Sequence, residues 1–200
     1  MDEIVKQAIA KWPDVPHCYG WLALDARGAW RMRDERAQQQ DLPGERIAHP
    51  ALLGFIRRNY LADERGRWFF QNGPQRVYVN LELTPYIVRS DPQRGFVTQT
   101  DEPLAGIDAV WLTDSGCLIL RSQGKIAALD DRDLAQCIER LRIDDSIVSD
   151  SALLDWIDNQ TGATARPLHL LHDGRQLPVQ RIAQAALAQH FGFVSAPQAA

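Results

Sequence analysis

The alternation of apolar and polar residues repeats a strand–turn–strand pattern at separated places in the chain. WLALDARGAW (21–30) and WLTDSGCLIL (111–120) both begin with Trp-Leu, cross a turn that contains Asp and Gly, and become apolar again. A third, shorter copy, LHLLHDGRQLPVQRIAQAALAQHFGF, closes the chain. Each copy leads into a helical pattern, which predicts a repeated strand–turn–strand–helix unit. Chance convergence is the alternative, because Asp-Gly hairpins are common.

The repeat leads to a specific structural prediction. Residues 19–59 and 109–143 should show the same order of elements, with Trp21 and Trp111 in equivalent buried positions. In the second copy, Cys137 lies on the apolar face of the expected helix. An unpaired Cys in that position behaves as a small core residue, so we expect it to be buried.

Other segments show the spacing of amphipathic helices. Trp12-Pro13 ends the first of them, and Pro50 suits the first turn of the second. The segments that we expect to be helical are 3–11, 49–61 and 150–160.

The segment RGRWFFQNGPQRVYVNLELTPYIVRS (65–90) predicts a hairpin with Asn72-Gly73 at its turn. From Arg76 to Ile87 apolar and polar residues alternate almost without interruption, which is typical of a half-buried strand. Twelve such residues exceed the usual strand of about five or six. We therefore expect the strand to bend or to change partners at Pro85, which has no N–H to donate.

Together these patterns predict an α+β protein with two small antiparallel sheets, packed helices and internally repeated units. The segment 91–108 is rich in turn-forming and polar residues. We take it as a linker and expect an N-terminal α+β domain over 1–95 and a C-terminal α+β domain over 104–195.

Composition and charge narrow the function classes. The formal net charge of −4 disfavours a nucleic-acid partner, since phosphate binding needs a basic surface. The N-terminal segment lacks a secretory pattern, and no apolar run is long enough to cross a bilayer, so no membrane partner is expected. The three cysteines have no CxxC spacing, which indicates reduced thiols in the cytoplasm.

The sequence shows no strong catalytic or cofactor motif, and we expect neither a catalytic residue, a metal nor a cofactor. His17 and Cys18 are neighbours in a strand and should point to opposite faces, so they do not predict a nucleophile and its base. Arg31 and Arg33 belong to a basic stretch that Asp34 interrupts, and we interpret it as a solvated hairpin and loop.

The polar face of the long alternating strand is the best candidate for a binding site. Tyrosine combines a rigid apolar ring with a polar tip, which suits ligand recognition. We predict that Tyr78, Asn80 and Glu82 line a groove. The full set of candidate ligand-binding residues adds the neighbouring arginine and two tryptophans that follow Gly turns: Arg76, Trp30 and Trp68. Packing in the core is the alternative for the tryptophans.

The stretches GWLALDARGAWRMRDE and RWFFQNGPQRVYVNLELTPYIVR resemble proteobacterial families of domains of unknown function that are built from repeated strand–turn–strand–helix motifs. The likeness covers roughly residues 17–143. The resemblance implies an α+β protein of small two-domain form, with ligand sensing or signalling rather than catalysis. It supplies no functional residues for this chain.

We therefore expect a non-enzymatic cytoplasmic module that binds a small ligand or a partner protein in a regulatory or signalling role. One alternative is an enzyme with an active site in a cleft between the two domains. Another is a structural subunit of a larger complex. The sequence does not define the ligand, the partner or the oligomeric state.

Overall fold

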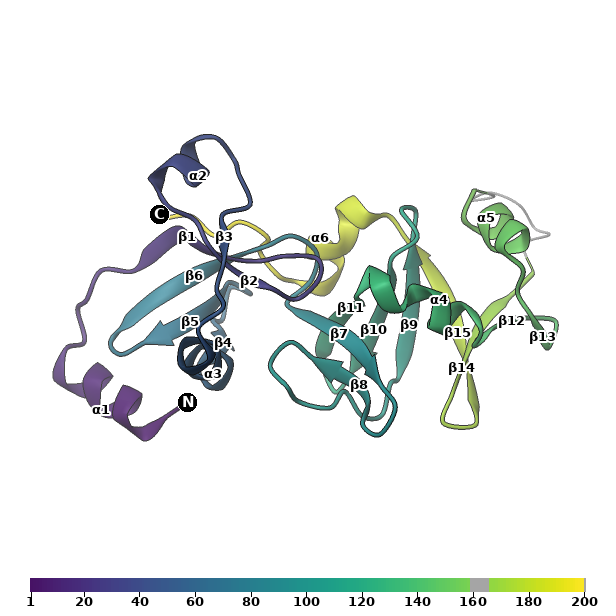
Figure 1. Cartoon of the computed structure of the whole chain (residues 1–200), viewed down its shortest axis with the longest axis horizontal. Coiled ribbons are helices and arrows are strands. Elements are labelled where there is room, and N and C mark those ends of the chain that lie inside the picture. Colours follow the sequence, from purple (N-terminus) through teal and green to yellow (C-terminus); the bar gives the residue numbers. More distant parts are fainter. Residues whose placement is uncertain (159–165, 200) are drawn as a thin grey trace. The chain divides into compact units, whose positions relative to one another are not determined.

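A computed structural model describes residues 1–158 and 166–199 (Figure 1). Contacts between residues divide the chain into two compact units. The first unit contains Met1–Pro85, Gln99–Asp101 and the described residues from Ala188 onward. The second contains the described residues of Tyr86–Thr98 and Glu102–Leu187.

The first unit is built on a six-stranded sheet with the strand order β3-β2-β1-β6-β5-β4. Its strands are β1 (Cys18–Leu24), β2 (Trp30–Met32), β3 (Glu45–Arg46), β4 (Tyr60–Ala62), β5 (Trp68–Asn72) and β6 (Gln75–Leu81). Asn72 pairs with Gln75, so the β5–β6 hairpin turns at Gly73-Pro74, one residue later than we predicted. Gly73 takes a φ of +57°, which favours glycine at the first position of such a turn.

The helices in the N-terminal segment of this unit are α1 (Glu3–Lys11), α2 (Glu35–Gln39) and α3 (Pro50–Arg58). α2 begins at a cap in which the Asp34 carboxylate accepts a hydrogen bond from the N–H of Ala37 at 2.7 Å. Pro50 stands in the first turn of α3, where its missing N–H costs no helical hydrogen bond. The helices predicted at 3–11 and 49–61 are therefore present, the second with shorter bounds.

Two hairpins of the first unit share one turn design. The motif Asp-x-Arg-Gly-x-Trp occurs at 25–30 and again at 63–68. In each turn the first carboxylate accepts hydrogen bonds from the backbone N–H groups two and four residues later. The glycine N–H donates to the Asp carbonyl at 3.0 Å in both turns. The two hairpins thus use the same local chemistry to reverse the chain.

The long alternating segment breaks where we predicted it to break. β6 ends at Leu81, and the next strand, β7 (Tyr86–Asp91), begins directly after Pro85. The two strands belong to different sheets. The division between the units therefore falls at Pro85, whereas the expected linker, 91–108, contains β8 (Gly95–Thr98). Its turn-forming residues make the β7–β8 hairpin and the segment that follows.

The second unit is built on a nine-stranded sheet with the order β13-β12-β14-β15-β9-β10-β11-β7-β8. Its strands after β8 are β9 (Ala109–Thr113), β10 (Leu118–Ser122), β11 (Lys125–Leu129), β12 (Leu141–Ile143), β13 (Ser146–Ile147), β14 (Leu168–His172) and β15 (Arg175–Ile182). β9, β10 and β11 are almost entirely buried, as their continuous apolar runs indicate.

Helices follow two hairpins of this unit in the same order. β10 and β11 lead into the 3₁₀ turn η1 (Asp131–Asp133) and α4 (Leu134–Ile138). β14 and β15 lead into η2 (Gln184–Ala186) and α6 (Leu187–Phe191). The repeat itself stays a prediction, and in the second copy the shared order starts at β10 rather than at β9. The remaining helix, α5 (Asp150–Asp158), covers most of the predicted 150–160, whose last two residues lie outside the described residues.

The α+β class is confirmed, but both sheets are mixed rather than antiparallel. β1 runs parallel to β6, β7 to β11 and β9 to β15. Each of these pairs joins strands far apart in the chain, and such pairing leaves no local sequence signal.

The predicted burial of Trp111 is confirmed, and the predicted burial of Trp21 is wrong. Trp111 is 4% exposed, but Trp21 is 40% exposed. The register between β1 and β6 shifts between Cys18 and Leu22, and Leu22 takes the buried position. Trp21, as its neighbour in the strand, points to the opposite face. Cys137 is buried as predicted, and all three cysteines are free.

Candidate functional site

The first unit contains a hollow of about 420 Å³ where the ends of three strands meet two connecting segments. The strands β1, β2 and β6 contribute from one side, and the α2–β3 connection and the C-terminal segment complete the wall. The lining residues are Ala23, Leu24, Asp25, Arg31, Arg33, Asp41, Leu42, Pro43, Asn80, Leu81, Glu82, Ser195 and Ala196.

Arg31 is held on this wall by a carboxylate and a carbonyl. Its Nε donates to Oδ2 of Asp25 at 2.7 Å, and Nη1 donates to the carbonyl of Gly44 at 3.2 Å. The other oxygen of Asp25 accepts the N–H groups of Arg27 and Ala29 in the turn that follows β1. The turn therefore orients Asp25, and Asp25 orients Arg31.

Arg33 is more deeply buried than the sequence indicated. It is 8% exposed, so the interpretation of this stretch as a solvated loop is wrong for Arg33. Its Nε donates to the carbonyl of Leu42 at 3.0 Å, and Nη2 donates to the carbonyl of Ala37 and to Oδ1 of Asp41. The guanidinium thereby closes the α2–β3 connection, which explains its burial in a stretch that is charged throughout.

Asn80 lines the same hollow, and its side chain carries an unsatisfied polar atom. Its Oδ1 is buried and accepts no hydrogen bond from any residue that the structure describes. Such an atom has lost its contacts with water without gaining a partner, and leaving it so costs about 1–3 kcal/mol. Few buried polar groups of folded proteins stay unpaired, so this one calls for an explanation.

Glu82 and the C-terminal segment fix the edge of the hollow. Oε2 of Glu82 accepts the N–H of Ala26 at 2.9 Å, and the N–H of Glu82 donates to the carbonyl of Leu24. The N–H of Leu81 donates to the carbonyl of Ser195 at 2.7 Å. Two of the three residues predicted to line a groove, Asn80 and Glu82, thus line this hollow.

Tyr78, the third of these residues, lies in the core of the unit instead. Its ring is fully buried and stacks on Tyr19 with 4.6 Å between the ring centroids. The Arg67 guanidinium lies 4.7 Å from the Tyr78 ring centroid. The Tyr78 hydroxyl donates to Oδ2 of Asp63 and accepts from Nη2 of Arg67, each at 3.1 Å. Burial, together with the Asp63 carboxylate, raises the pKa of Tyr78.

The other three candidate residues also make contacts away from the hollow. Trp30 is buried against Tyr60, with 5.0 Å between the ring centroids. Trp68 is half-buried and packs on the same tyrosine at 4.8 Å. The Arg76 guanidinium lies 4.6 Å from the ring centroid of Phe69. None of the three is among the described residues that line the hollow.

Several residues that line the hollow were not predicted from the sequence to belong to a binding site. Asp25 could have been recognised from the Asp-x-Arg-Gly-x-Trp motif, because in both copies the Asp carboxylate accepts backbone N–H groups of its own turn and is thereby held in place. Arg33 lies in a charged stretch where burial is not expected. Ser195 reaches the hollow from the C-terminal end of the chain, and no periodicity of the sequence predicts that contact.

The described residues contain neither a candidate metal site nor a helix that could span a membrane. No group of three or more His, Cys, Asp or Glu side chains among them is arranged to hold a metal ion. Among the helices that the structure describes, none has both the length and the apolar character to cross a membrane.

Comparisons with known proteins give a family but no activity. The model of the family DUF2944, described as a protein of unknown function (DUF2946), matches residues 1–198. The comparison with curated proteins gave no match.

Two solved structures of DUF1285 family proteins are similar to this chain. The protein from Silicibacter pomeroyi DSS-3 has 12% sequence identity and a TM-score of 0.50, over 90% of this chain and 96% of its own. The protein from Shewanella baltica OS155 has 16% identity and a TM-score of 0.40, over 58% of this chain and 88% of its own. The first shows a shared fold.

Proposed function

We propose that this chain, which belongs to the DUF2944 family of proteins of unknown function, binds a small neutral polar molecule in the hollow of its first unit. The observation that carries the proposal is the buried, unpartnered Oδ1 of Asn80. A ligand N–H placed against this oxygen would supply the missing hydrogen bond and recover the free energy lost by its burial.

The two arginines on the wall of the hollow indicate which second group the ligand carries beside its N–H donor. Among the described residues, Nη2 of Arg31 and Nη1 of Arg33 donate to no acceptor, so both can meet a ligand oxygen or ring nitrogen. A ligand with an acceptor beside a donor would bond the arginines and Asn80 together. Carboxamides, lactams and the edges of nucleobases have this arrangement.

The charge of the wall favours a neutral ligand over an anion. Two arginines face three carboxylates, those of Asp25, Asp41 and Glu82. A phosphate or dicarboxylate would therefore meet a wall whose formal charge is already negative. The size of the hollow, about 420 Å³, is within the range of small-molecule sites.

Binding without a reaction is the role that we infer for this site. The oxygens of Asp25 accept N–H groups from Arg27, Ala29 and Arg31, and Glu82 accepts the N–H of Ala26. Because protein donors occupy these carboxylates, the carboxylates position the wall rather than act on a substrate. A module of this kind suits a regulatory or signalling role, in which binding of the ligand, rather than its conversion, has the functional effect.

A matched pair of substitutions tests the proposal. Asn80→Leu removes the unpartnered oxygen, so the free energy of unfolding should stay the same or rise by up to about 1–2 kcal/mol. Asn59→Leu is the control, because the Asn59 amide is buried and satisfied: it accepts from the N–H of Asp2 and donates to the carbonyl of Phe55. Its loss should cost about 2 kcal/mol or more. Urea unfolding measures both.

Ligand binding is then measured with nicotinamide and uracil as probes. Both should raise the melting temperature of the wild-type protein and shift the NMR signals of the Asn80 amide group. N,N-dimethylnicotinamide, which has no amide N–H, should do neither, and Asn80→Leu should abolish the response to all probes. If Asn80→Leu destabilises the protein as much as Asn59→Leu, or if the dimethylated probe binds equally well, the proposal is wrong.

A further inference from the structure

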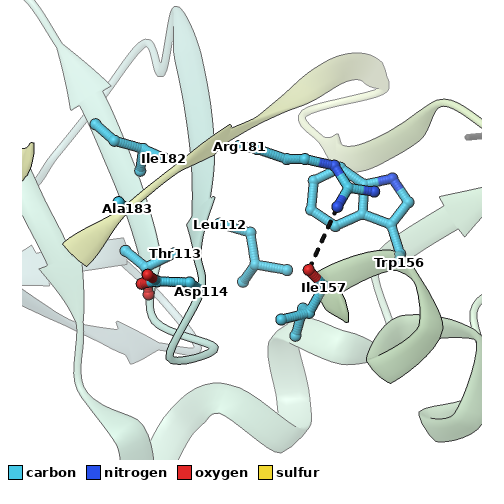
Figure 2. A pocket seen from close by; sticks show the side chains of 8 residues that line it. All are labelled: Leu112, Thr113, Asp114, Trp156, Ile157, Arg181, Ile182 and Ala183. Carbon is cyan, nitrogen blue, oxygen red and sulfur yellow. Dashed lines mark hydrogen bonds between the residues drawn. The ribbon is translucent and has the colours of Figure 1, made fainter. Parts of the chain in front are cut away.

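The second unit contains a separate hollow of about 220 Å³ at the ends of two parallel strands (Figure 2). β9 and β15 run parallel, with Leu112 opposite Arg181 and Thr113 opposite Ile182. Their carboxyl ends therefore lie side by side, the position at which open sheets with parallel strands commonly bind ligands. The lining residues come from these two ends and from α5: Leu112, Thr113, Asp114, Trp156, Ile157, Arg181, Ile182 and Ala183.

Arg181 lies at one end of this hollow, flat against Trp156. Its guanidinium carbon is 3.8 Å from the centroid of the Trp156 ring, and Nη1 donates to the carbonyl of Ile157 at 3.4 Å. Trp156 is itself fixed, since its indole N–H donates to the carbonyl of Arg166 at 3.2 Å. Figure 2 shows the guanidinium over the Trp156 ring, and this stack restricts its orientation.

The guanidinium of Arg181 has no negative partner in the described part of the chain. Its Nη2 is buried and makes no hydrogen bond with any described residue. Burial also lowers the pKa of Arg181. A partly buried cation without an anion is unfavourable, and the ring and the carbonyl offset only a part of that cost.

The opposite end of the hollow carries a negative charge. In Figure 2 Asp114 lies across the hollow from Arg181, with Leu112 between them. Oδ1 of Asp114 accepts the N–H of Gln184 at 2.8 Å, which fixes the carboxylate in place. The Thr113 hydroxyl beside it is occupied, since it accepts the N–H of Cys117 and bonds the hydroxyl of Ser115. The hollow thus has one cation, one anion and an aliphatic floor between them.

We propose that this hollow binds a small aliphatic monocarboxylate, whose carboxylate pairs with the guanidinium of Arg181. The alkyl chain lies on Leu112 and Ile157, and Asp114 repels any ligand that has a second negative charge at its other end. An apolar cavity of about 150 Å³ holds a benzene molecule. This hollow of about 220 Å³ is larger, so it has room for a ligand of at least that size. The site is independent of the hollow in the first unit.

The experiment is an NMR titration of the whole protein with butyrate, observed at the indole N–H of Trp156. Butylamine has the same chain with the opposite charge, and succinate adds the second carboxylate. Butyrate should give a saturable shift of the Trp156 signal. Butylamine should give none, and succinate should bind at least about tenfold more weakly than butyrate, as expected for a like charge near Asp114.

Two variants assign the effect to the two ends of the hollow. Arg181→Met keeps an unbranched side chain on Trp156 and removes the guanidinium, so the affinity for butyrate should fall by about tenfold or more. Arg175→Met, on an exposed position of the same strand, is the control and should bind as the wild type does. Asp114→Asn should raise the affinity for succinate to about that for butyrate.

Each remaining outcome overturns the proposal. It is wrong if butyrate leaves the Trp156 signal unmoved, if butylamine shifts it equally, or if succinate binds more tightly than butyrate. If Arg181→Met does not fold, the titrations of Asp114→Asn decide. The proposal is wrong if this variant has the same ratio of succinate to butyrate affinity as the wild type, because the ligand would then not extend toward Asp114.

Discussion

Asp63 shows how much of the first unit depends on single side chains. Burial alone would raise its pKa, but hydrogen bonds outweigh that effect and lower the pKa. They come from the backbone N–H and guanidinium of Arg67, the N–H of Arg65 and the hydroxyl of Tyr78. The carboxylate therefore holds together a turn, a half-buried arginine and the stacked tyrosine.

The lowered pKa of Asp63 predicts a pH dependence of stability. A carboxyl group whose folded pKa is lowered stabilises the protein above its unfolded pKa, which is about 3.9, and the contribution disappears as the pH falls through the folded value. Asp63→Asn should thus lower the free energy of unfolding by about 1–3 kcal/mol at pH 7. The difference from the wild type should shrink as the pH is lowered below about 4.

Urea unfolding at a series of pH values measures this difference. Asp41→Asn is the control, since the Asp41 side chain is 99% exposed although it pairs with Arg33. Exposed ion pairs contribute little, so the control should change stability by less than about 1 kcal/mol. A loss in Asp63→Asn that is the same at all pH values would contradict the assignment.

Local chemistry in the sequence predicts some side-chain environments and not others. Cys137 was placed correctly because its helical face has apolar neighbours. Tyr78 was placed in a groove because its strand alternates, and alternation assumes that the polar face meets water. The structure covers that face with Tyr19 and Arg67, which come from other elements. No pattern within the strand itself encodes those contacts.

At the scale of elements, the C-terminal segment is the part on which the first hollow most depends. After α6 the chain runs beside the turn between β4 and β5, where the N–H of Val194 donates to the carbonyl of Gly66 at 3.0 Å. Arg67 and Val194 form a parallel bridge. The segment then reaches β6, where Ser195 joins the wall of the hollow. Gly66 is therefore a contact point as well as a turn residue.

Gly66→Ala should detach this segment. Gly66 has a φ of +72°, and a Cβ there would lie 2.1 Å from the carbonyl oxygen of Gly192. Gly116→Ala is the matched control: its turn has the same N–H to carbonyl bond and a φ of +81°, but a Cβ would meet nothing within 4 Å. The control should cost about 1–2 kcal/mol for the left-handed backbone, and Gly66→Ala should cost more.

Hydrogen exchange distinguishes the contact from the backbone cost. In Gly66→Ala the amides of Val194 and Leu81 should exchange faster than in the wild type, because both donate to partners across this contact. In Gly116→Ala they should not change. Equal losses of stability in the two variants, with no change at these amides, would show that the segment does not rely on the close approach at Gly66.

Turns and strand ends that depend on residues adjacent in the sequence were predictable. The pairing of strands that are distant in the sequence was not. Pro85 marked the end of the alternating segment because a missing N–H has the same effect in any context. The turns were predictable to within one residue, as Gly73-Pro74 shows. By contrast, the parallel pairing of β1 with β6 joins residues more than fifty positions apart. The hollow depends on such long-range pairings, so sequence reasoning reached only Asn80 and Glu82.

At the scale of the whole molecule, the first unit is not a continuous piece of the chain. It combines Met1–Pro85 with Gln99–Asp101 and the described residues from Ala188 onward. The side chain of Gln99 donates to the carbonyl of Pro85 at 3.1 Å, and Phe193 is buried at 7% exposure. An N-terminal fragment that ends at the domain boundary we expected from the sequence therefore lacks two of the three segments.

This architecture predicts the behaviour of a fragment that contains residues 1–95. On its own the fragment should be less stable than the first unit within the full chain, with fast exchange at Leu81, because the Ser195 carbonyl that its N–H donates to is missing. A synthetic peptide of residues 188–199 should bind the fragment and restore that protection. The affinity should be modest, since the peptide loses the high effective concentration that the chain provides.

A peptide in which Phe193 is replaced by Ala is the control for specific binding. Removing a buried aromatic ring costs about 3–5 kcal/mol in a core, so this peptide should not restore protection at any practical concentration. Protection that is already complete in the fragment alone would mean that residues 1–95 fold independently and that the C-terminal segment only covers them. Rescue by the first peptide and not by the second would show that the chain must return to its N-terminal unit to complete the hollow in which we place the ligand.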